Sequence, residues 1–240
     1  MGLKIFKDTD APKAPTSSFA DDVVGRFRSG YQVNDRPAAL TEWRVTTGDP
    51  EVAEAVRAIM GGGEAQEWAA KGEDNLEVFT TSGSVDVIVE KVADLRQRLV
   101  LWGRNGKPIY ISDGETISYP DERKGEPDPD ASLDLNARKQ KARDGIGAEP
   151  QIEVYFRLAA NPDLGIFKFQ SASWSLVRDL DYNGTEDALT DAVADSNGAG
   201  ALVSLALENV SFVAKNGPQA GKTVSFTKPV LTVKGAAAPF

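Results

Sequence analysis

The feature that most limits the fold of this 240-residue chain is a series of short runs in which apolar and polar residues alternate. Residues 41–47 alternate Trp43 and Val45 with polar neighbours, and residues 152–158 and 166–170 follow the same pattern. Longer alternating runs at 201–215 and 223–234 predict a long terminal hairpin. A period of two is typical of strands that bury one face, and glycine- and asparagine-containing turns between runs favour antiparallel pairing. We therefore predict an α+β fold, predominantly antiparallel β-sheet with a few short helices.

A few segments carry helical features instead. Asp49 is a favourable helix N-cap and Pro50 suits the first helical position, so we expect a helix to begin there. We also expect a helical turn at residues 175–180, a helix at 186–193, and a short exposed helix over the basic run at 138–143. Each of these segments is short, which leaves the sheet as the main predicted framework.

A charged central segment separates the strand-forming regions. Residues 113–134 contain eight acidic residues, and Pro120, Pro127 and Pro129 interrupt regular structure there. Because this segment has little to bury, we expect residues 113–147 to be the most mobile internal part of the chain. The sequence thus predicts two sheet-forming halves around a charged central excursion. The predicted units are a flexible N-terminal arm (1–37), a first α+β half (38–112), a charged, partly helical excursion (113–149), a second α+β half (150–235) and a tail (236–240).

The chain contains no histidine and no cysteine, which narrows the chemistry open to it. Zinc sites rely on imidazole and thiolate ligands, and the common nucleophilic relays need histidine. We expect no catalytic residues, no cofactor and no bound metal. Asp128 and Asp130, with Asp121 and Glu126, come closest to a metal cluster. They lack the central glycine and the final glutamate of a calcium loop, and we interpret them as a solvated acidic loop. A carboxylate-based, metal-assisted enzyme built around residues 113–130 remains an alternative.

The net charge of −9 and the isoelectric point near 4.7 indicate which class of macromolecule the chain is suited to bind. Phosphate neutralisation supplies much of the affinity of duplex-binding proteins, so an acidic chain is poorly suited to grip DNA directly. It is better suited to a basic protein, such as one that itself binds DNA. The sequence shows no signal-peptide pattern and no apolar run long enough to span a membrane, so we expect a cytoplasmic protein without membrane or small-molecule ligands.

Two groups of residues are candidates for binding a partner. Lys168 lies between Phe167 and Phe169 in an alternating run, and Trp174 follows in a serine-rich turn, where part of its ring could stay accessible. The basic run contributes four candidates, namely Arg138, Lys139, Lys141 and Arg143. As an alternative function, the aromatic residues could stack single-stranded nucleic acid. That reading requires Phe167, Phe169 and Trp102 to be exposed on one basic face.

Several stretches together resemble a phage and prophage family, the recombination directionality factors that act with large serine integrases. The resembling stretches, in chain order, are residues 30–34, 42–50, 67–74, 101–103, 169–174 and 228–231. They extend over roughly residues 24 to 235, nearly the whole chain, and the ordered set carries the resemblance more than any single motif.

The resemblance implies a protein without catalysis of its own. Such a protein would bind a large serine integrase, meet DNA only through it, and switch it from integration to excision of a prophage. One departure concerns the central excursion, where relatives carry cysteines that resemble a small metal knuckle. Asp128, Asp130 and Ala148 stand in such places here, which puts a zinc-dependent role in doubt. The alternative implied by the aromatic strands is a single-stranded nucleic-acid-binding or replication accessory protein of a phage.

Overall fold

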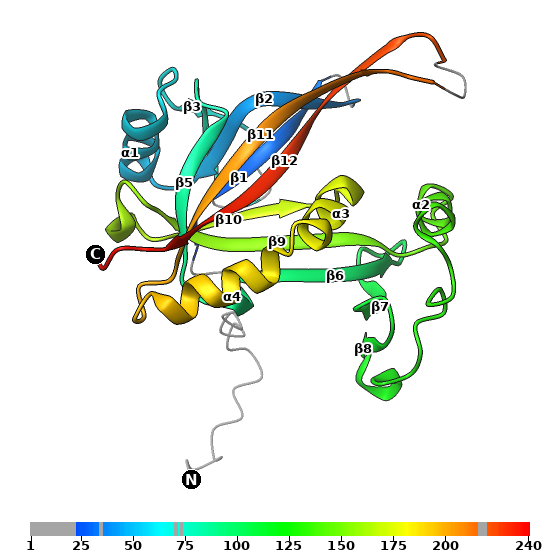
Figure 1. Cartoon of the computed structure of the whole chain (residues 1–240). Helices are drawn as coiled ribbons and strands as arrows, with labels where there is room; N and C mark the ends of the chain where they lie inside the picture. Colours follow the sequence, from blue (N-terminus) through cyan, green and yellow to red (C-terminus); the bar gives the residue numbers. More distant parts are fainter. Residues whose placement is uncertain (1–22, 34–35, 70–71, 73, 216–219) are drawn as a thin grey trace, which may run out of the picture.

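The computed structural model describes residues 23–33, 36–69, 72, 74–215 and 220–240. The helices are α1 (Pro50–Met60), α2 (Leu135–Arg143), α3 (Trp174–Tyr182) and α4 (Thr185–Asp195), with 3₁₀ turns η2 (Val92–Asp94), η3 (Asp121–Arg123) and η4 (Pro162–Leu164). The strands are β1 (Val23–Val33), β2 (Arg36–Thr47), β3 (Gln66–Glu67), β4 (Leu76–Phe79), β5 (Ser84–Val89), β6 (Leu95–Trp102), β7 (Pro108–Ser112), β8 (Ile117–Tyr119), β9 (Glu149–Leu158), β10 (Ile166–Ser171), β11 (Ala201–Val213) and β12 (Thr223–Ala236). Helices α3 and α4 lie in front of β9 and β6, and the β11–β12 hairpin rises past them (Figure 1).

Both predicted halves of the chain contribute strands to one sheet. The main strand order is β12-β11-β5-β9-β10-β1-β2-β4-β3, and β6, β7 and β8 extend from β9. Strand β5 therefore lies between two strands of the second half, and β1 pairs in parallel with β10, where Phe27 stands opposite Phe169. The α+β class with mostly antiparallel pairing is confirmed. The two halves do not form separate sheets, because pairing between them fills the middle of the strand order.

The predicted boundary of the N-terminal arm needs correction. Residues 23–33 form β1, which hydrogen-bonds to β2 on one side and, over its first residues, to β10 on the other. The reason is Phe27, which is only 2 % exposed and anchors the strand in the core. Arg26 and Arg28 flank this residue in the sequence and so point to the opposite face of the strand. Residues 1–22 of the predicted arm lie outside the described part of the chain.

An aromatic cluster forms the centre of the core. The Phe27 ring packs edge-to-face against Trp43, Phe156 and Phe167 at centroid distances of 5.6, 5.2 and 5.7 Å. Trp43 also meets Phe169 at 5.2 Å. Such edge-to-face pairs add to the free energy gained by burying the rings themselves. The cluster joins β1, β2, β9 and β10, and it explains why these four strands stay together.

The helices begin where the sequence provides N-caps. Asp49 accepts a hydrogen bond from the Glu51 amide at 2.8 Å, with Pro50 in the first turn of α1, as predicted. Ser173 caps α3 through the Leu176 amide, and Asp134 caps α2 through the Ala137 amide. Helices α3 and α4 occupy the two later segments expected to be helical. Among the residues described, no helix is both long enough and apolar enough to cross a membrane.

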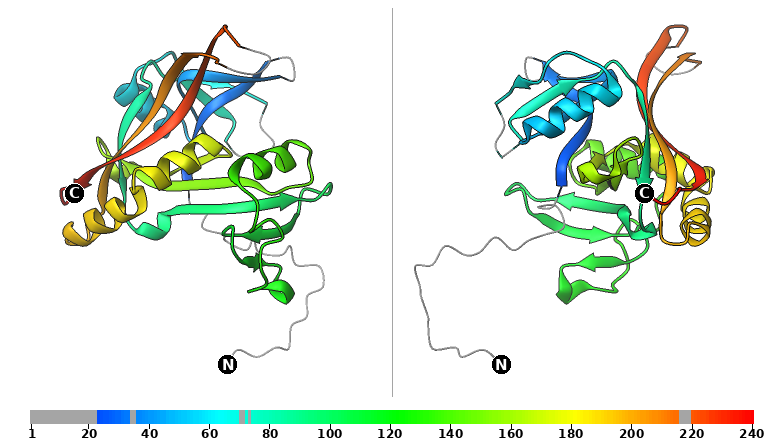
Figure 2. Two further views of the ribbon diagram at one scale, coloured as in Figure 1. Left: turned by 45° about the vertical axis from the view of Figure 1, so that its right-hand side comes forward. Right: turned by 90° about the vertical axis from the view of Figure 1, so that its left-hand side faces the viewer.

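The β11–β12 hairpin extends beyond the rest of the sheet. It rises away from the body of the molecule in both views of Figure 2, while the excursion that carries β8 and α2 lies on the other side, next to β7. Its outer part exposes Phe212, Val213 and Phe226, with exposed fractions of 48, 58 and 40 %. The long terminal hairpin predicted from the alternating runs is therefore present, and its far end presents apolar side chains.

Candidate functional site

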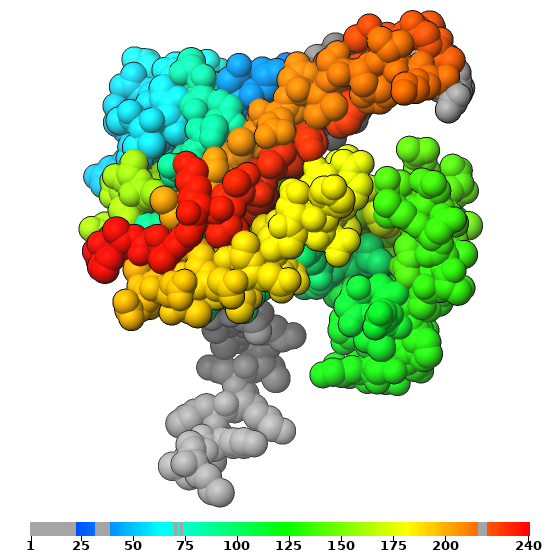
Figure 3. Space-filling model, viewed as in Figure 1, coloured from blue at the N-terminus to red at the C-terminus, as the bar shows by residue number. Residues whose placement is uncertain are grey.

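Two grooves lie on opposite faces of the sheet. Neighbouring residues of a strand point to opposite faces of the sheet. In β9, Ile152 points to the face that carries the core rings, whereas in β10 Lys168 points to the opposite face. The first groove includes Ile152 and lies between α3, α4 and the excursion, with a volume of about 790 Å³. A hollow between the yellow helix and the green excursion is visible in Figure 3. The second includes Lys168 and measures about 930 Å³.

The first groove has an apolar floor and an acidic rim, and is called the acidic groove below. Leu99, Ile152, Trp174, Val177 and Leu180 contribute apolar surface to it. Trp174 is the first residue of α3 and is half-buried, so part of its indole faces the groove. The rim carries five exposed carboxylates, namely Asp113, Glu115, Asp181, Glu186 and Asp187.

The charges around the acidic groove are not balanced. Three arginines also line it, but each forms an ion pair with a carboxylate outside the rim: Arg98 with Glu153, Arg138 with Asp128, and Arg178 with Asp179. The five rim carboxylates have no ion pair with any residue in the described ranges. Gln97 donates a hydrogen bond to Glu186 at 2.7 Å, which orients one carboxylate without neutralising it. The groove therefore presents negative charge around an apolar floor.

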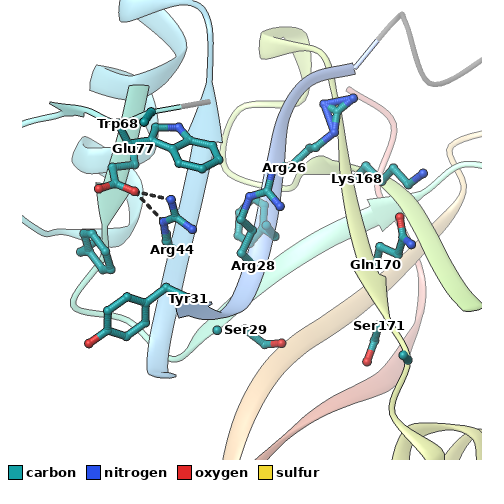
Figure 4. Close-up of a pocket in the computed structure, with 15 residues that line it drawn as sticks. Arg26, Arg28, Ser29, Tyr31, Arg44, Trp68, Glu77, Lys168, Gln170 and Ser171 are labelled. Carbon is teal, nitrogen blue, oxygen red and sulfur yellow. Dashed lines mark hydrogen bonds and ion pairs between the residues drawn. The ribbon is translucent and has the colours of Figure 1, made fainter. Parts of the chain in front are cut away.

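The second groove gathers cations and aromatic rings and is called the arginine groove below (Figure 4). Arg26 and Arg28 project from β1, Arg44 from β2 and Lys168 from β10. The groove opens where β1 and β10 separate, since their pairing ends at Phe27 and Phe169, while both strands continue. Trp68, Tyr31 and Phe79 line it as well, and Figure 4 shows Trp68 and Tyr31 on the side of Arg44.

Three of the four cations in the arginine groove have carboxylate partners. Arg26 pairs with Asp74 at 2.7 Å, the Arg44 Nε donates to Glu77 at 2.6 Å, and Lys168 pairs with Glu153. Arg28 is the exception, because its Nε donates to the Thr46 hydroxyl at 3.1 Å and no carboxylate of the described chain forms an ion pair with it. Burial lowers the pKa of Arg28, and the nearby charges of Arg44 and Arg26 lower it further. The positive charge of Arg28 is thus poorly compensated.

Comparison with known protein families supplies the identity that these surfaces alone do not. The Gp3-like family, described as recombination directionality factor-like, matches residues 24–234 of this chain. The chain belongs to the recombination directionality factor-like family. The resemblance drawn from the sequence is therefore confirmed, and it covers all the described strands except the first and last few residues. No solved structure matches this chain.

The structure separates the partner-binding residues predicted for this recombination directionality factor-like protein. Trp174 and Arg138 line the acidic groove together, and Lys168 lines the arginine groove on the other face. Phe167 and Phe169 are both 0 % exposed, so the expectation that their rings reach the surface is corrected. They point into the core because the alternation that turns Lys168 to the other face of the sheet buries its two neighbours, and Lys168 itself is only 9 % exposed.

The remaining basic candidates lie on α2, outside both grooves. Lys141 forms an ion pair with Asp130, Lys139 is half-buried, and Arg143 is exposed in the last turn. The predicted exposed helix is present, but only part of its positive charge is free to meet a partner. Trp102, required by the stacking alternative, is 42 % exposed at the end of β6.

The central excursion contains more buried structure than its composition predicts. Asp128 and Asp130 are 3 and 5 % exposed, so the interpretation of a solvated acidic loop is corrected for these two residues. Asp128 accepts hydrogen bonds from Ser112 and from the Asp130 amide, and it pairs with Arg138 at 3.6 Å. Burial, together with the charges of Asp128 and Asp130, raises the pKa of Tyr110 to about 12.

Asp128, Asp130 and Ala148, which the resemblance likens to the places of a metal knuckle, each lie near Tyr110. Ala148 packs with Tyr110 and Ile117 in a small core, and the two aspartates act on the same tyrosine. Within the described residues, no three potential ligands form a group that could hold a metal. Ion pairs to Arg138 and Lys141 connect this part of the excursion to α2.

Sequence reasoning missed the arginine groove because its residues come from three distant segments. Arg26 and Arg28 fell within the predicted arm, and Arg44 was taken only as a polar residue of a strand. The available signal was the spacing of Arg26 and Arg28, which are two residues apart and so share a strand face. The acidic rim was missed for a similar reason, since it combines the excursion with α3 and α4.

Proposed function

We propose that this protein binds a large serine integrase and switches it from integration to excision of a prophage, without catalysis of its own. The observation that carries the proposal is the family match over residues 24–234. The direction of switching and the identity of the integrase class come from the resemblance. In this account the protein acts in the host cytoplasm and meets DNA through the integrase.

The acidic groove is the surface that suits such a partner best. An integrase must bind DNA phosphates, so it carries basic segments, and five uncompensated carboxylates around an apolar floor favour a basic, amphipathic segment. Tryptophan and arginine are the residue types that most often anchor interfaces, and Trp174 and Arg138 both line this groove. The exposed end of the β11–β12 hairpin provides a second apolar contact surface.

Directionality requires only a difference in affinity. If the protein binds the excision-competent arrangement of the integrase more tightly than the other, it shifts the population toward excision. Moving a 1:99 preference to 99:1 takes about 5.5 kcal/mol of differential binding. A protein–protein interface of ordinary size can provide this amount, so no catalytic group is required.

A binding titration tests the partner surface directly. The full-length protein is titrated into its cognate large serine integrase, first alone and then with Asp181→Asn and Glu186→Gln combined. We expect saturable binding that weakens by about tenfold in the double variant, because surface charge complementarity is reduced. As a control, Asp163→Asn removes an acidic residue of η4, outside the groove, and should leave the affinity unchanged. Absence of binding to any integrase tested would contradict the proposal.

A further inference from the structure

The arginine groove contains a charge that the described part of the chain does not neutralise with an ion pair. Arg28 lies half-buried between Arg26 and Arg44, and its terminal nitrogens have no hydrogen-bond partner among the residues described. An uncompensated guanidinium removed from water is costly, and its paired terminal N–H groups match the geometry of a phosphate or carboxylate. The position therefore suits an anionic ligand.

Aromatic rings stand beside this cation. The Trp68 ring lies 4.4 Å from the Arg44 guanidinium and 5.6 Å from that of Arg28. Tyr31 and Phe79 are 37 and 38 % exposed and meet edge-to-face at 5.9 Å on the same side of the groove. Accessible rings beside a cationic channel are the arrangement on which single-stranded nucleic acids stack their bases.

We propose that the arginine groove binds a short single-stranded segment of nucleic acid, with a phosphate at Arg28 and bases against Tyr31 and Phe79. This is a second binding activity, on the opposite sheet face from the acidic groove, and it does not depend on the proposed integrase partner. The sequence suggested Phe167 and Phe169 as stacking residues, but both are buried. In this proposal the stacking residues are instead Tyr31 and Phe79, which lie on a basic face.

Size and chemistry favour this ligand over its competitors. The groove's volume of about 930 Å³ is that of a small-ligand pocket, so a few nucleotides fit, whereas a duplex does not enter. The net charge of −9 also opposes duplex binding. An acidic protein segment could satisfy Arg28, but its aliphatic carboxylate side chains have no flat rings to stack on the exposed rings of Tyr31 and Phe79.

Fluorescence anisotropy tests this proposal without any integrase present. A fluorescein-labelled oligothymidine of about 12 nucleotides is titrated with the full-length protein at about 50 mM and about 200 mM salt. We expect saturable binding that is tighter than binding of a duplex of the same length. Arg28→Gln should weaken it by about tenfold and reduce the dependence on salt, because one phosphate contact is lost.

Two further variants keep the result interpretable. Lys234→Gln removes an exposed cation from β12, where it pairs with Asp86, and should bind like the wild type. Tyr31→Ala combined with Phe79→Ala leaves every cation in place and should also weaken binding, which tests the groove even if Arg28→Gln fails to fold. Equal binding by wild type and both groove variants, or no saturable binding, overturns the proposal. Binding of an oligoglutamate peptide in place of oligothymidine also overturns it and assigns the groove to an acidic protein segment.

Discussion

The variant Trp174→Ala shows whether Trp174 anchors an interface or is an ordinary core residue. Removal of a fully buried tryptophan costs about 3–5 kcal/mol of stability. Trp174 is half-buried at the start of α3, whereas Trp43 is 0 % exposed inside the aromatic cluster. We therefore expect Trp174→Ala to lower the free energy of unfolding by only about 1–2 kcal/mol, and Trp43→Ala to cost the full amount for a buried ring.

The effect of Trp174→Ala on binding should be larger than its effect on folding. An anchoring tryptophan contributes about 2 kcal/mol or more, so the Kd for the integrase should rise by roughly thirtyfold. Urea unfolding and a binding titration measure the two quantities on the same samples. Tyr182→Ala is the matched control, because Tyr182 ends the same helix, is 87 % exposed and does not line the acidic groove.

Two outcomes would refute this reasoning. A stability loss of about 3–5 kcal/mol would show that the Trp174 ring is structural. An unchanged Kd in the folded variant would show that the partner binds elsewhere, and the exposed end of the β11–β12 hairpin would become the next surface to test.

Three further predictions concern the excursion and two titrating groups. Arg138→Met leaves the Asp128 carboxylate buried without its ion pair, so limited proteolysis should cut the excursion faster than in the wild type, and an unchanged rate would contradict this. Burial raises the pKa of Asp179, but hydrogen bonds from Lys228 and Arg178 outweigh it and lower the pKa below the ordinary value of 3.8. The ionised Asp179 should therefore stabilise the fold above pH 3.8, and this stabilisation should be lost as the pH falls through the lower pKa of the folded state. Asp179→Asn should flatten that loss in thermal scans below pH 4. The pKa of Tyr110 is raised from 10.0 to about 12 in the folded protein, so between these pH values the unfolded chain loses the hydroxyl proton while the folded protein keeps it. The free energy of unfolding should therefore fall with rising pH more steeply in the wild type than in Tyr110→Phe.

The local elements of this fold could be predicted because their causes are local. Asp49 and Pro50 start α1 where the sequence indicates, and the alternating runs at the C-terminal end form the β11–β12 hairpin. The strand order could not be predicted in the same way. The parallel pairing of β1 with β10 joins residues about 140 positions apart, and it depends on Phe27 packing among rings from three other strands.

The residues that line the two grooves could be predicted from the sequence only in part. Alternation shows that Lys168 and Phe167 face opposite sides of β10, but it does not show which side is covered. Here the aromatic side is the core, so the lysine, not the phenylalanines, reaches a groove. That Arg28 forms no ion pair with a carboxylate in the described ranges also emerges only in three dimensions, because it depends on where Asp74 and Glu77 lie.

A recombination assay shows whether this protein controls the direction of an integrase. The cognate integrase is incubated with the pair of attachment sites used for integration, or with the pair that integration produces, with and without the full-length protein. We expect the protein to raise recombination of the second pair and to lower recombination of the first, and we expect Trp174→Ala to weaken both effects. If the folded protein leaves both site pairs unaffected, or changes both in the same direction, the proposed control of directionality is wrong.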